Sequence, residues 1–69
     1  MNITKEYDSN NGIVILTVYC EPLPVEKHTI IASALADGTV DMDVEIARLT
    51  AEAEERLNVH NVVMGMIGG

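Results

Sequence analysis

One apolar stretch, residues 13–20 (Ile-Val-Ile-Leu-Thr-Val-Tyr-Cys), constrains the fold more than any other part of the chain. Its β-branched residues favour a strand, in which successive side chains point to opposite faces. One face would then hold Val14, Leu16 and Val18, and the other Ile13, Ile15 and Tyr19. Because both faces are apolar, the stretch is predicted to be a central strand that needs cover on both sides.

The segments beside this strand indicate how it is paired. Residues 2–8 alternate imperfectly in the manner of a strand, and residues 9–12 (Ser-Asn-Asn-Gly) are typical of a hairpin turn. Pro22 and Pro24 cannot donate hydrogen bonds to a sheet, so they are expected to end the central strand. The first two elements therefore form an antiparallel hairpin.

Residues 25–36 can be interpreted in two ways. Thr29, Ile30 and Ile31 favour a strand, whereas the alanines that follow and a possible helix start at Pro24 favour a helix. Gly38 could end either element. We expect a strand here and keep the helix as the alternative.

Residues 41–57 are predicted to form a helix. Apolar side chains recur at helical spacing to form one stripe, which Val44, Ala47 and Ala51 are expected to widen. This stripe consists of Met42, Ile46, Leu49, Ala53 and Leu57. Thr39 or Asp41 could cap the start, Glu52 and Arg56 could pair one turn apart, and Asn58 suits the residue just past the end.

The final stretch, Val59–Ile67, is predicted to be a strand, weakened by Gly65. The fold class expected is therefore α+β, as a single small domain spanning residues 1–69. A small antiparallel sheet in the order β-β-β-α-β, or alternatively β-β-α-α-β, would have one long amphipathic helix packed on one face.

One helix can cover only one face of the sheet. The second cover could be residues 25–36 as a helix, a second copy of the chain, or another protein. A chain of 69 residues also has a core that rarely supplies more than roughly 3–5 kcal/mol without help. The leading functional hypothesis is therefore a non-enzymatic protein–protein interaction module that forms a homodimer.

The charge balance limits the possible partners. Eleven acidic and four basic residues give a net charge of −7, which argues against direct binding to nucleic acid or to an anionic membrane. No charged leader precedes an apolar run, and the longest such run is too short to span a bilayer. A single cysteine fits a reducing compartment, so the expected location is the cytoplasm.

No catalytic, cofactor-binding or metal-binding residue is predicted. Cys20, His28 and His60 share no ligand spacing, and the histidines lie near no recognisable nucleophile. Cys20 is expected to be a buried apolar residue. The acidic segment 37–45 has the look of a calcium loop, but its glycine follows the first aspartate directly, which does not fit an EF-hand.

Two other functions remain as alternatives. An acidic helix surface could bind a basic, nucleic-acid-binding protein, as a small acidic inhibitor or regulator would. The partner-binding residues expected there are Asp43, Glu45, Glu52, Glu54 and Glu55.

The size and the terminal Gly68-Gly69 resemble those of ubiquitin-like sulfur carriers, whose C-terminal carboxylate is activated. This resemblance implies that Gly69 would react. The carrier fold has an early helix followed by two further strands. The helix predicted here starts near Asp41 and leaves room for only one strand after it.

Overall fold

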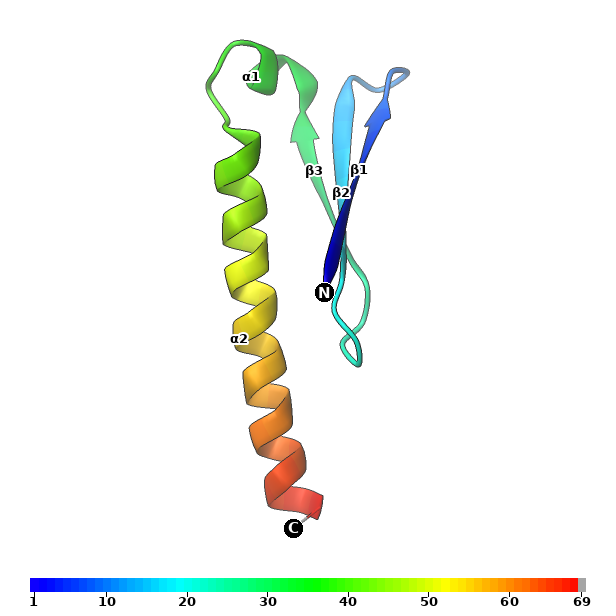
Figure 1. Ribbon diagram of the computed structural model, residues 1–69. Helices are drawn as coiled ribbons and strands as arrows, with labels where there is room; N and C mark the ends of the chain where they lie inside the picture. The colour runs from blue at the N-terminus through cyan, green and yellow to red at the C-terminus, as the bar shows by residue number, and fades with distance from the viewer. Residues whose placement is uncertain (69) are drawn as a thin grey trace.

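The computed structural model describes residues 1–68 as an α+β fold, a three-stranded antiparallel sheet followed by a short helix and a long one (Figure 1). The elements are β1 (Asn2–Asp8), β2 (Ile13–Tyr19), β3 (Glu26–Ile31), α1 (Ala32–Ala36) and α2 (Met42–Gly68). Strand β2 lies in the middle of the sheet. The predicted fold class, central strand and long helix are confirmed.

The β1–β2 hairpin closes through the turn predicted at residues 9–12. The Asp8 carboxylate accepts hydrogen bonds from the Asn10 backbone (3.0 Å) and from the Asn11 side-chain amide (2.8 Å). Gly12 has a φ of 62°, which a residue with a Cβ rarely adopts. Asp8 then pairs with Ile13, so the turn sets the register of the whole hairpin.

Residues 25–36 contain both of the elements that their sequence allows. Glu26–Ile31 pairs with β2 as the strand β3, and Ala32–Ala36 forms the single-turn helix α1. The expected strand is confirmed, and a helix over the whole stretch is wrong. At five residues, α1 is too short to cover a sheet face.

Helix α2 begins where its cap was expected. The Asp41 carboxylate accepts hydrogen bonds from the backbone amides of Asp43 (2.8 Å) and Val44 (3.3 Å), so Asp41 is the cap. Thr39 has another role, because its own amide donates to Asp37 at 2.8 Å. Asp43 and Glu45 lie in the first turn, where the helix dipole favours negative charge.

The core lies between α2 and one face of the sheet. Its buried members come from β2, β3 and α2 and from the residue that follows β2, and they are Leu16, Val18, Cys20, Ile30, Leu49 and Ala53. The predicted stripe of α2 is confirmed, since Met42, Ile46 and Leu57 also pack against this cluster. The prediction that Val44, Ala47 and Ala51 widen this stripe is wrong, because Val44 is 61% exposed and both alanines are exposed as well.

The predicted strand at Val59–Ile67 is wrong, because these residues continue α2 without a break. Asn58 lies inside α2, so the prediction that it follows the end of the helix is also wrong. Once residues 42–57 are helical, each further residue adds a hydrogen bond without a new nucleation cost. A strand would instead need a free sheet edge to pair with, which no local pattern can specify.

Gly65 offers a test of this helical extension. It lies inside α2, and a Cβ placed on it would meet nothing within 4 Å. Replacing it with alanine should therefore stabilise the helix by about 0.5–1 kcal/mol. Circular dichroism should show a higher midpoint of thermal unfolding and no loss of helical signal. A lowered midpoint would indicate that this segment is not helical.

The second face of the sheet is not covered by any element within residues 1–68. It presents Ile13, Ile15 and Tyr19 from β2, together with Ile31 from β3. Ile31 is 63% exposed and Tyr19 is 43% exposed. The expectation that one helix covers only one face is thus confirmed, and the second cover is absent from the described chain.

Candidate interaction surfaces

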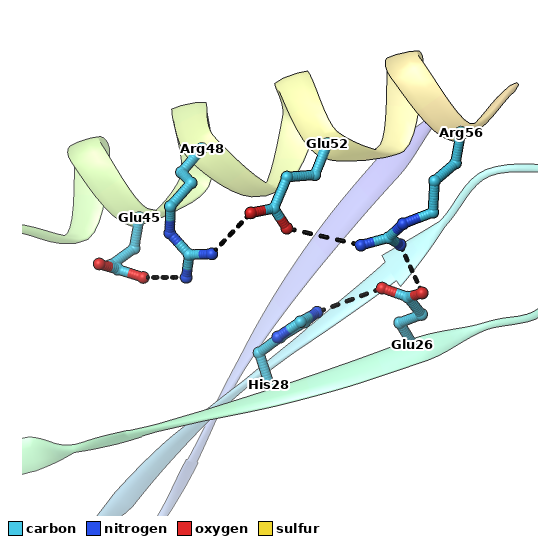
Figure 2. A network of polar contacts seen from close by, with 6 residues as sticks. All are labelled: Glu26, His28, Glu45, Arg48, Glu52 and Arg56. Atoms are coloured by element: carbon cyan, nitrogen blue, oxygen red, sulfur yellow. Dashed lines mark hydrogen bonds and ion pairs between the residues drawn. The ribbon is translucent and has the colours of Figure 1, made fainter. Parts of the chain in front are cut away.

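A chain of polar contacts runs along α2 and ends on β3 (Figure 2). Arg48 donates to Glu45 (2.7 Å) and to Glu52 (2.9 Å). Glu52 also accepts from Arg56 at 3.5 Å, which confirms the predicted pair. These contacts join side chains one turn apart on the helix and stabilise α2 itself.

The last links of this network tie the helix to the sheet. Arg56 forms an ion pair with Glu26 of β3, and Glu26 lies 3.4 Å from the imidazole Nε2 of His28. All these side chains are partly exposed, from 26% to 49%. The network thus links α2 to β3 at a solvated position on the surface.

Arg56 sets the charge state of Glu26. The hydrogen bond from Arg56 holds the pKa of the Glu26 carboxyl below its ordinary value of 4.5, and His28 adds to this effect. Glu26 likewise raises the pKa of the Arg56 guanidinium. The ion pair is therefore favoured over a range of pH that extends below the usual titration of a glutamate.

This arrangement predicts how stability changes in acid. Since the folded-state pKa of Glu26 is lowered, its contribution is present above the unfolded-state pKa and is lost as pH falls through the folded value. The thermal midpoint of Glu26→Gln should therefore fall less than that of the wild type between about pH 5 and pH 3. Arg56→Gln should also reduce the fall of the thermal midpoint in acid, because it removes the main cause of the lowered Glu26 pKa. Parallel acid curves for all three proteins would contradict this account.

The five acidic residues expected to bind a partner do not form one row. Glu45 and Glu52 accept hydrogen bonds from Arg48, so their negative charge is largely balanced by an ion pair within the molecule. At about 100° per residue, Asp43 and Glu54 share one side of α2, and Glu55 lies about 100° away. Asp43, Glu54 and Glu55 are exposed. The structure thus divides the predicted acidic surface into a paired part and a smaller exposed part.

The other residues that the sequence singled out are separate from one another. Cys20 is buried in the core, His28 lies on β3 beside Glu26, and His60 is half-buried on α2. Within residues 1–68, no three His, Cys, Asp or Glu side chains are grouped so that they could hold a metal ion. Gly68 is the last residue of α2, and Gly69 lies outside the described residues, so the carrier hypothesis stays a prediction.

The surface that sequence reasoning missed is the end of α2. Residues 58–67, called the overhang below, run past the sheet and its loops (Figure 1). Six apolar side chains here are between 44% and 79% exposed: Val59, Val62, Val63, Met64, Met66 and Ile67. The sequence carries a sign of this surface, because no charged residue follows Arg56. The same apolar composition also suits the strand predicted for Val59–Ile67.

No helix within residues 1–68 is both long enough and apolar enough to cross a bilayer. Comparisons with protein-family models, with curated proteins and with solved structures found no match. The function is therefore argued from the chain's own surfaces.

Proposed function

We propose that this protein is a non-enzymatic interaction module that associates first with copies of itself. The observation that supports the proposal is the overhang, where six neighbouring apolar side chains lie exposed. Scattered exposed apolar residues are normal on a protein surface, but a contiguous group of this kind is typical of a contact site.

The small core gives a second reason. Within residues 1–67 only six apolar side chains are buried, and the described molecule extends 50 × 21 × 13 Å, an elongated shape with a large surface. A domain of this size commonly gains stability from oligomerisation when it has no disulfide or metal. Self-association would cover apolar surface that the monomer leaves in water.

Sedimentation equilibrium across a wide dilution series tests the proposal. The expected result is a mass that approaches the dimer at hundreds of micromolar and returns to the monomer on dilution, as a small interface requires. A folded chain that sediments as a monomer at every concentration would contradict self-association. The exposed surfaces would then have to be explained by a different protein.

The exposed part of the acidic surface supports a second candidate, an inhibitor or regulator of a basic protein. Asp43 and Glu54 share one side of α2 and could face cationic side chains. A lysine-rich peptide used as a probe should bind in about 0.05 M salt and much more weakly at about 0.3 M, where screening is stronger. Asp43→Asn together with Glu54→Gln should abolish that binding, and binding that ignores salt would exclude this candidate.

A further inference from the structure

We infer that two copies pair through their overhangs as antiparallel helices, with the twofold axis passing near Val63 and Met64. This inference rests on the proposed self-association and names the surface and geometry that produce it. The partner is thus a second copy of this chain, held by the last turns of α2.

The pairing surface is a continuation of the face that already packs on the sheet. His60 follows Leu49 by eleven residues, which returns it to within about 20° of the same side of the helix. From His60 the apolar positions recur at the i, i+3, i+4 and i+7 spacing of a helix-packing seam, through Val63, Met64 and Ile67. The sheet covers this face up to Leu57 and leaves it open beyond that point.

The position of the sheet decides the orientation of the pair. In a parallel pair the same face of both helices would have to meet along its whole length, where the sheet already covers Met42–Leu57. In an antiparallel pair only the overhangs meet, and the two sheets lie at opposite ends. The layers would be His60 against the second copy's Ile67 and Val63 against its Met64.

The distribution of charge favours this surface over the open face of the sheet. Each chain has a net charge of −7, so most contacts between copies would bring acidic residues together. The overhang has no Asp, Glu, Lys or Arg, and an antiparallel pair keeps Glu52 and Glu55 away from the same residues of the second copy. The open sheet face has charged side chains at both of its borders, Glu6 and Asp8 on β1 and Lys27 on β3, so a contact there would have to remove charges from water.

The apolar area available limits the strength of the pair. Burying the three apolar side chains of this seam, Val63, Met64 and Ile67, which are between 44% and 76% exposed, removes on the order of 300 Å² of apolar surface from each chain. A standard protein interface buries about 800 Å² per partner. The dimer is therefore expected to dissociate in the micromolar range or above, and it should be studied at high protein concentration.

Two matched variants separate the overhang from the sheet face. Val63→Lys and Ile31→Lys each replace an exposed apolar residue by lysine, so both change the net charge equally. Val63→Lys should raise the dimer dissociation constant by about tenfold or more, whereas Ile31→Lys should leave it within about twofold. Circular dichroism would check that both variants keep the wild-type helix content.

Spin labels would measure the orientation directly. On a Cys20→Ala background, labels at Asn61→Cys, which lies in the overhang but off the seam, should lie within about 25 Å of each other in the dimer. Labels at Ala47→Cys, on the exposed side of α2, should lie about 50 Å apart, because the antiparallel offset is about 33 residues at 1.5 Å each. Two short distances would overturn the antiparallel arrangement.

The possible failures differ between the two proposals. A protein that is a monomer at every concentration overturns both of them. A dimer that survives Val63→Lys but is lost in Ile31→Lys overturns only the overhang pairing, and places the contact on the open sheet face. A dimer with a long distance between Asn61→Cys labels excludes the overhang pairing by an independent route.

Discussion

Replacing Leu16 with alanine is expected to destabilise the protein by about 2–5 kcal/mol. Leu16 is completely buried at the centre of β2, so its loss removes apolar contacts and leaves a cavity against α2. Because a core of this size supplies roughly 3–5 kcal/mol in all, much of the variant should be unfolded at room temperature. Urea unfolding followed by circular dichroism measures the change.

Val44→Ala is the control for this experiment. Val44 is 61% exposed on α2, and its truncation should change the free energy of unfolding by no more than about 0.5 kcal/mol. A variant at Leu16 that unfolds like the wild type would mean that α2 does not pack on this face of the sheet. That result would contradict the fold itself.

Replacing Ala53 with leucine should cost about 1–3 kcal/mol, although leucine is a good helix former. Ala53 is 2% exposed in the contact between α2 and the sheet, so a larger side chain there would meet the buried cluster. Three additional carbon atoms would have to displace the helix or distort its neighbours. The free energy of unfolding in urea would report this strain.

Ala51→Leu provides a matched comparison, since it makes the same substitution two residues away on the exposed side of α2. Its effect should stay within about 0.5 kcal/mol. Equal effects at the two positions would show that the loss at Ala53 comes from helix propensity or solubility and not from packing.

The central strand and the amphipathic helix could be predicted because each is determined by a local pattern. Residues 13–19 have a β-branched, two-sided apolar composition that suits only the middle of a sheet, and the stripe from Met42 to Leu57 has helical spacing. The turn at Gly12 and the cap at Asp41 were equally local, since each needs only its neighbours in sequence.

The overhang could not be predicted in this way. Val59–Ile67 contains valines and a glycine that suit a strand or a helix about equally, and it continues α2 although β1 and β3 each leave an outer edge of the sheet unpaired. The ion pair between Arg56 and Glu26 was also inaccessible, because these residues lie thirty positions apart in sequence. The sequence therefore does not reveal the overhang as an exposed helical surface, because the predicted helix ends at residue 57 and α2 continues to Gly68.

By itself, the sequence determined the class of the fold, the place of the hairpin turn, the start of α2 and the side of α2 that meets the sheet. These follow from side-chain periodicity and from hydrogen bonds within a few residues. Only the tertiary structure decided that α2 runs on to Gly68 and that one sheet face and the overhang stay uncovered. The physical reason is that burial depends on which distant segments meet, and that helix propagation past Leu57 adds a hydrogen bond for each residue without a new nucleation cost.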